Sequence, residues 1–246
     1  MIRLSPEQQS LERPITTAGQ LLVEGRVPEM FFREMVLACG LADAVEVRTF
    51  GDISKDNLQT YLELLTQKAA FKEQVKRVGI IRDAEDSTAD AAFKSVQAAL
   101  RGAQLFAPAA MNTLEGSPLA VGVFVLPNCQ DAGMLESLCL WAVAEVEAAQ
   151  PNGLLPCVDD FFDCLTKRGK MPVENSNWRV ASCEIAARSD SSSMAFCMRT
   201  MLCKSMTGTK LAPPASGRFQ TVPSSNSPMF MVSFAMWVWL FFSSVV

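Results

Sequence analysis

One short segment, residues 78–87, constrains the fold of this chain more than any other. It opens with the apolar run Val78-Gly79-Ile80-Ile81, which is β-branched at three of its four positions. Three carboxylates follow within four residues, at Asp83, Glu85 and Asp86, and a helix-like segment begins at about residue 88. An apolar run that opens onto a loop and then a helix is typical of a buried parallel strand. In open α/β sheets, ligands bind at the carboxyl ends of such strands.

Strand-like and helix-like segments alternate up to about residue 170. We predict strands at 20–23, 45–50, 78–81 and 119–126. Predicted helices lie near 29–39, 55–67, 88–102 and from 133 onward, with a short one near 71 and another around 157–167. This alternation predicts a three-layer α/β fold with a mainly parallel sheet of about four strands, covered by helices on both sides.

The composition changes after residue 170. Residues 171–246 hold 6 Lys/Arg and 3 Asp/Glu, a net charge of +3, whereas residues 1–170 hold 16 and 23, a net charge of −7. We therefore expect an irregular tail over 169–246, which ends in the nearly uncharged apolar segment 229–246. Three interpretations stay open: an out-of-frame or degenerate tail, a membrane anchor formed by 229–246, or a buried element of the domain.

Histidine is absent from all 246 residues. This absence excludes Ser-His-Asp and Cys-His nucleophiles, His-ligated zinc, and histidine as a general acid or base. The eight cysteines form no Cys-x-x-Cys pair, and the polar start of the chain predicts no signal peptide, so we expect reduced thiols and a cytoplasmic protein. The net charge of −4 argues against a broadly basic surface for nucleic acid, although not against a local one.

Acidic residues follow three of the predicted strands. Glu24 ends the first, the three acids of residues 83–86 follow the third, and Glu136 lies just after the fourth. If these strands are parallel neighbours, their acids meet at one edge of the sheet. Carboxylate oxygens suit Mg²⁺ or Mn²⁺, which in turn bind phosphate substrates. Arg26 and Arg82 flank the acids and can contact phosphate.

The residues that carry this pattern resemble the Toprim domain. The likeness lies in Leu21-Leu22-Val23-Glu24-Gly25 before a helix, and in Gly79-Ile80-Ile81-Arg82-Asp83-Ala84-Glu85-Asp86. Two further segments are similar to a group of bacterial Toprim-like proteins related to the overcoming-lysogenization-defect nucleases. These segments are Val121-Gly122-Val123-Phe124-Val125-Leu126-Pro127 and Gly133-Met134-Leu135-Glu136. The resemblance covers residues 18–168 and implies a Rossmann-like Toprim domain over that range.

The resemblance implies a Mg²⁺-dependent phosphodiester enzyme, a nuclease acting on nucleic acid. Its catalytic acids would be Glu24, Asp83 and Glu85, with Asp86 and Glu136 as further metal ligands. The sequence departs from the Toprim pattern in two places, because Glu85 replaces an aspartate and Val27 follows where relatives carry polar residues. These departures favour an alternative: a non-catalytic module that binds a nucleotide, a nucleic acid or a partner protein in a defence or regulatory system.

Structural interpretations of the same residues also stay open. Glu24 can point into solvent near a helix N-terminus, where negative charge is favoured. Asp83 or Asp86 can cap the helix that follows, and Glu136 can be an ordinary surface residue of its helix. Arg26 and Arg82 can form ion pairs with these same acids.

Overall fold

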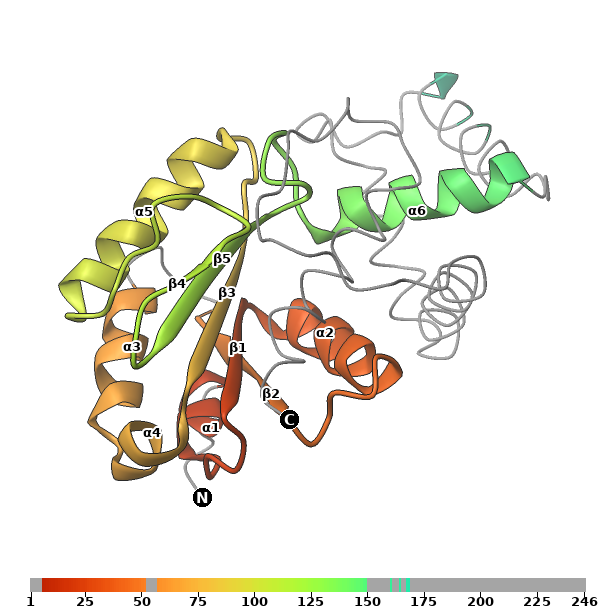
Figure 1. Ribbon diagram of the computed structural model, residues 1–246. Coiled ribbons are helices and arrows are strands. Elements are labelled where there is room, and N and C mark those ends of the chain that lie inside the picture. The colour runs from red at the N-terminus through yellow and green to blue at the C-terminus, as the bar shows by residue number, and fades with distance from the viewer. Residues whose placement is uncertain (1–5, 52–56, 150–159, 161–163, 165–166, 169–246) are drawn as a thin grey trace, which may run out of the picture.

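A five-stranded sheet lies between two layers of helices (Figure 1). The computed structural model describes residues 6–51 and 57–149, with residues 160, 164 and 167–168. The strands are β1 (Gly19–Glu24), β2 (Val45–Phe50), β3 (Arg77–Asp83), β4 (Leu114–Glu115) and β5 (Ala120–Leu126). The helices are α1 (Pro6–Glu12), α2 (Arg26–Ala38), α3 (Asn57–Gln67), α4 (Ala69–Gln74), α5 (Ala89–Gly102) and α6 (Leu135–Ala149).

The strand order is β2-β1-β3-β5-β4, and the four long strands are parallel. The predicted α/β class and mainly parallel sheet are therefore confirmed. The structure adds the two-residue strand β4, which pairs antiparallel with β5. Each long strand lies within two residues of its predicted position at either end, because its apolar residues, continuous or alternating, stop at a polar or glycine-containing turn.

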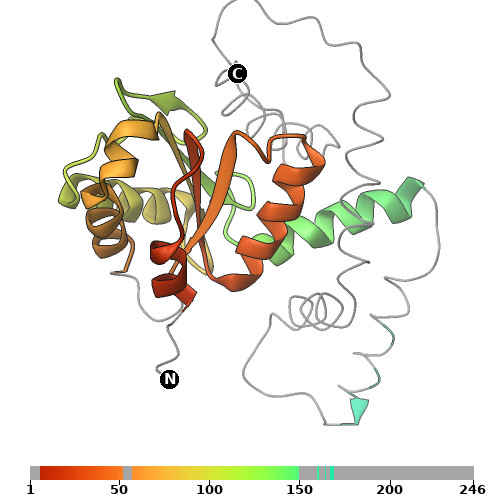
Figure 2. The ribbon, with the colours of Figure 1, turned by 90° about the horizontal axis from the view of Figure 1, so that it is seen from below.

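Side chains of the sheet alternate between two apolar cores. On one face, Leu22, Ile80 and Val123 pack with residues of α3, α4 and α5. On the other, Val23 and Phe124 pack with residues of α2 and the start of α6. Figure 2 shows the two helical layers on opposite sides of the sheet. Because β3 lies between β1 and β5, its carboxyl end opens at the middle of the sheet.

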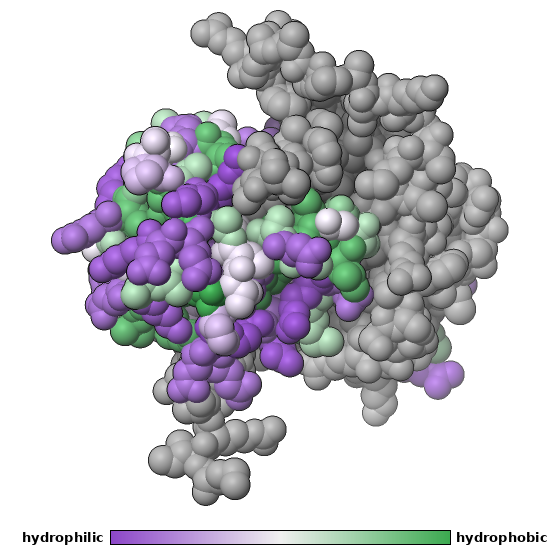
Figure 3. Space-filling model, turned by 60° about the horizontal axis from the view of Figure 1, so that its bottom comes forward, coloured by the Kyte–Doolittle hydropathy of each residue, from purple (hydrophilic) through white to green (hydrophobic). Residues whose placement is uncertain are grey.

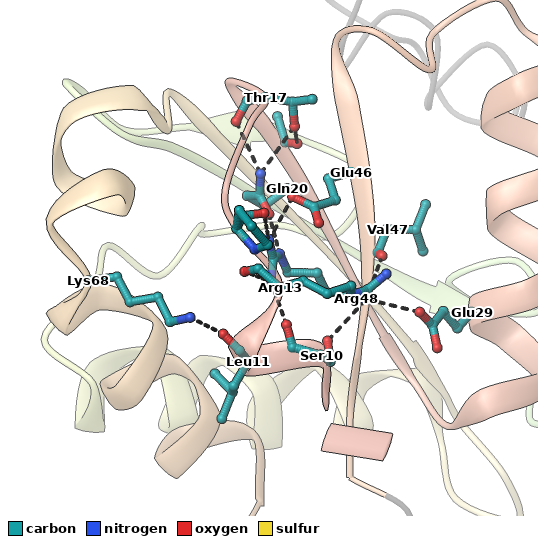
Figure 4. Close-up of polar contacts among 12 residues, drawn as sticks. Ser10, Leu11, Arg13, Thr17, Gln20, Glu29, Glu46, Val47, Arg48 and Lys68 are labelled. Carbon is teal, nitrogen blue, oxygen red and sulfur yellow. Dashed lines mark hydrogen bonds and ion pairs between the residues drawn. The ribbon is translucent and has the colours of Figure 1, made fainter. Parts of the chain in front are cut away.

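Helix α1, which sequence reasoning did not predict, is joined to edge strand β2 by the fully buried Arg48 (Figure 4). The Arg48 guanidinium donates to the side chains of Gln20 and Glu46 and to the carbonyl oxygens of Ser10, Arg13 and Pro14. The Ser10 hydroxyl also lies 2.9 Å from the Tyr61 hydroxyl of α3. A buried charge persists only when it is fully hydrogen-bonded, so this network ties the N-terminal segment to the sheet.

Several predictions fall on other parts of the chain. The tail over 169–246 and its apolar segment 229–246 lie outside the described residues. Of the helix predicted around 157–167, only residues 160, 164 and 167 are described, and all three are helical. No helix in the described ranges is both long and apolar enough to cross a membrane.

With the lower side of Figure 1 brought forward, Figure 3 shows mainly hydrophilic side chains on the described residues, with small apolar areas between them.

Candidate functional site

The carboxyl ends of β1, β3 and β5 form the candidate site, here called the acidic rim: Glu24, Asp83, Glu85, Asp86 and Glu136. The three strands are adjacent and parallel, so the predicted acids do share one edge of the sheet. Glu24 and Asp83 are the last residues of β1 and β3, and Glu136 is the second residue of α6, after the β5–α6 loop. Glu85 and Asp86 are exposed in the loop that follows β3.

Asp83 is an acid of the rim whose pKa is strongly raised. Burial, and after it the negative charge of Glu136, raise the pKa of Asp83 to about 7. The charges of Glu24 and Glu85 raise this pKa further, while a hydrogen bond from the Leu135 amide opposes the rise. Asp83 therefore lies within electrostatic reach of three other carboxylates, and close to neutral pH it readily exchanges a proton.

Asp83 also caps a helix, although not the predicted one. Its Oδ1 accepts a 3.0 Å hydrogen bond from the backbone N–H of Leu135, the first residue of α6. The helix that follows β3, α5, is capped instead by Thr88, whose hydroxyl accepts from the Ala91 amide. The expectation that Asp83 or Asp86 caps α5 is wrong, because the chain makes a further turn after Asp86 and brings Thr88 to the capping position.

The pleat of the sheet separates Glu24 from Asp83. Arg82 and Asp83 are neighbours in β3, so their side chains point to opposite faces. Arg82 lies on the α5 face, where its Nη1 is 3.4 Å from the Ser95 hydroxyl and its Nε is 3.5 Å from Glu24 Oε2. Asp83 lies on the α6 face. Glu24 and Asp83 therefore lie at the same edge of the sheet, but their side chains project from opposite faces of the sheet.

The predicted ion pairing of Arg82 with a rim acid is confirmed. Arg82 is 8% exposed, and its pairing with Glu24 excludes the interpretation that Glu24 simply points into solvent. Arg26 pairs outside the rim: its Nη1 lies 3.4 Å from Oε2 of Glu29, one turn along α2. Its side chain is 58% exposed, so most of its donors remain accessible to a ligand.

The loops of the rim are joined by backbone hydrogen bonds. The Glu85 amide donates to the Gly133 carbonyl at 2.7 Å, and the Gly133 amide donates back at 2.8 Å. Glu85 adopts a φ of 54°, which costs a non-glycine residue about 1 kcal/mol or more. Gly133 has a φ of 138°, and a Cβ there would lie 2.8 Å from the Ser137 hydroxyl. This pairing holds the acidic loop against the start of α6.

The start of α2 lies at the same rim. Gly25 precedes the helix with a φ of 86°, a conformation that suits glycine. The helix begins at Arg26, three residues before the start predicted near residue 29, so Pro28 is its third residue. Val27 is half-buried in the first turn and supplies no polar group.

The donor set fits a hard divalent cation by its chemistry, since Asp83 gathers several carboxylates whose repulsion a cation would relieve. Within the described residues, no three acidic or thiol side chains are arranged to hold a metal ion. Metal binding would therefore require rim side chains to rearrange.

Sequence reasoning missed one group of residues near the rim. Glu29 is buried on α2 and contacts Arg13, Arg26 and Arg33. The spacing of Arg26, Glu29 and Arg33 on one helix face is visible in the sequence. The contact with Arg13 is not, because Arg13 reaches Glu29 only through the docking of α1.

Together, the sheet and its rim define an α/β protein with a ligand site expected where the parallel strands end. The chain belongs to the family described as "Protein of unknown function (DUF3226)", whose pattern matches residues 18–177. No curated protein and no solved structure matches the chain.

Proposed function

We propose that this protein is a Mg²⁺-dependent phosphodiester enzyme of the Toprim type, a nuclease acting on nucleic acid. The observation that carries the proposal is the pKa of Asp83, raised to about 7 by burial and by three neighbouring carboxylates. Keeping such a group ionised in the folded protein is unfavourable, and a divalent cation would remove the penalty. The Toprim resemblance implies metal ligands at these positions, which supports the same interpretation.

Each rim residue has a role in this proposal. Asp83 and Glu24 would hold Mg²⁺ or Mn²⁺, with Glu85, Asp86 and Glu136 as further ligands. The bound cation would neutralise charge on a phosphate group and lower the pKa of a water. With no histidine in the chain, metal-bound hydroxide or a glutamate such as Glu24 would serve as the base, and Arg82 would keep Glu24 oriented through their ion pair. Arg26, which is largely exposed, would contact a substrate phosphate.

The test is cleavage of DNA and RNA, single- and double-stranded, with Mg²⁺ or Mn²⁺. Glu24→Ala and Asp83→Ala should each abolish metal-dependent cleavage, whereas Asp43→Ala, at an exposed position between α2 and β2, should not. Cleavage that persists in both rim variants, or that does not depend on metal, would contradict the proposal.

A second function is favoured by two observations. Glu24 is engaged by Arg82, and the described residues contain no ready-made metal site. Both suit a non-catalytic module that binds a nucleotide, a nucleic acid or a partner protein. Calorimetric titration with Mg²⁺ or Mn²⁺ separates the two functions. Binding at micromolar metal that is lost in Asp83→Asn favours the enzyme, and the absence of binding favours the module.

A further inference from the structure

Three arginines surround one buried carboxylate on α2. Glu29 is 3% exposed, and its Oε1 lies 2.9 Å from Arg13 and 3.9 Å from Arg33. Its Oε2 lies 3.4 Å from Arg26. Figure 4 shows Glu29 approaching the Arg13 network from α2. We call Arg13, Arg26 and Arg33 the arginine cluster.

The cluster carries more positive charge than Glu29 requires. A buried carboxylate needs one well-placed guanidinium, and Arg13, the nearest and least exposed of the three, supplies it. Arg26 and Arg33 are 58% and 59% exposed and lie farther from the carboxylate. The three arginines still outnumber the carboxylates when the exposed Glu34 on the same helix is counted together with Glu29. Each guanidinium has five N–H donors, so most donors of Arg26 and Arg33 remain accessible.

Glu29 gives these two arginines a common anchor. Arg26 lies one turn before Glu29 and Arg33 one turn after it, so both side chains converge on the same carboxylate. Arg13 holds that carboxylate from the other side and also donates to the outer carbonyl of Val47 in edge strand β2. Anchoring reduces the rotamer freedom that a guanidinium loses on binding a ligand, which favours anion recognition.

The position of the cluster connects it to the acidic rim. Arg26 is the first residue of α2, two residues after Glu24, and Arg33 is seven residues farther along, about 10 Å of helix. The rim itself repels a polyanion. A phosphate chain that reaches the rim therefore needs positive charge beside it, and α2 supplies that charge on one side.

We propose that Arg26 and Arg33, anchored by Glu29 and backed by Arg13, bind the phosphodiester backbone of nucleic acid and guide it to the acidic rim. This inference rests on the proposed function, because it names the surface that holds the nucleic-acid substrate. The contacts are to phosphate, so binding is independent of base sequence and strongly dependent on salt.

The experiment measures fluorescence anisotropy of a labelled 30-nucleotide DNA, as a single strand and as a duplex, at several salt concentrations. EDTA is present throughout, so binding is measured without metal or cleavage. The double variant Arg26→Gln/Arg33→Gln should weaken binding to at least one probe by about five- to tenfold per lost contact at 0.1 M salt. The negative slope of the logarithm of the association constant against the logarithm of the salt concentration should become shallower by about one for each arginine removed.

Two control variants make the result specific. Arg101→Gln removes an exposed arginine from the end of α5, on the opposite face of the sheet, and should leave affinity and slope unchanged. Glu34→Gln removes a negative charge beside the cluster and should tighten binding. Circular dichroism confirms that each variant folds.

The inference is overturned if neither probe binds, or if the double variant binds like Arg101→Gln. These outcomes differ from failure of the proposed function, which is measured as metal-dependent cleavage. If the protein binds DNA through the cluster but does not cleave it, this inference stands and the proposed nuclease activity is contradicted.

Discussion

Replacing Asp83 by asparagine should stabilise the metal-free protein at neutral and alkaline pH. The pKa of Asp83 is about 7 in the folded protein, against 3.8 for an ordinary aspartate. The folded state therefore binds the proton more tightly than the unfolded state does. The stability from this group is fully present below pH 4 and is lost as the pH rises through 7. The loss is on the order of 4 kcal/mol at pH 8.

Asparagine keeps the carbonyl oxygen that accepts from the Leu135 amide, but it cannot ionise. The free energy of unfolding of Asp83→Asn should therefore resemble that of the wild type at pH 4 and exceed it increasingly up to pH 8. Urea denaturation in EDTA at one-unit pH intervals measures this difference. Asp43→Asn, at an exposed position away from the rim, controls for the loss of one negative charge.

Added Mg²⁺ provides a second arm of this experiment. A ligand that binds only the folded state raises stability by about 2.7 kcal/mol at one hundred times its dissociation constant. Wild-type protein should gain such stability at pH 8, and Asp83→Asn should not. The reasoning is refuted if Asp83→Asn is no more stable than the wild type at pH 8, or if the difference between them does not change with pH.

Three further changes test other parts of the structure. Arg48→Met leaves the Gln20 side chain and the carbonyl oxygens of Ser10 and Pro14 without this donor and should cost at least about 3 kcal/mol in urea denaturation; a loss under about 1 kcal/mol would contradict the role of this network. Thr88→Ala removes the cap of α5 and should cost about 1 kcal/mol, whereas Thr88→Ser should be nearly neutral. Glu85→Gly relieves a positive φ and should add about 0.5–1 kcal/mol of stability in EDTA while weakening Mg²⁺ binding; a destabilised variant would show that the conformation is not strained.

The fold class could be predicted because its signals are local. The runs at Val45 and Val78 have the β-branched composition of strands, and the segment after Thr88 has the apolar spacing of a helix. Helix α1 could not be predicted in this way. It is short and polar, and it is held by contacts of Ser10 and Arg13 with the buried Arg48, a residue 35 positions or more away. Such contacts leave no periodic pattern in the sequence.

The candidate site could be predicted in outline. Acids that follow parallel strands of one sheet lie at the same edge, so Glu24, Asp83 and Glu136 could be grouped before their surroundings were known. Their partners could be predicted only in part. An ion pair between Arg82 and one of these acids was among the interpretations of the sequence, and the structure shows that the acid is Glu24. The capping of α6 by Asp83 could not be predicted, because it depends on which helix covers which face.

The sequence by itself determined the order of the four long strands and of the helices that follow them, and the end of the sheet at which its acids gather, because hydrophobic periodicity and strand direction are properties of short segments. Only the tertiary structure decided which face each acid occupies and how deeply it is buried. Neighbouring residues of a pleated strand point in opposite directions, so Arg82 faces α5 and Asp83 faces α6. The pKa of Asp83 and the anchoring of the arginine cluster both follow from that packing.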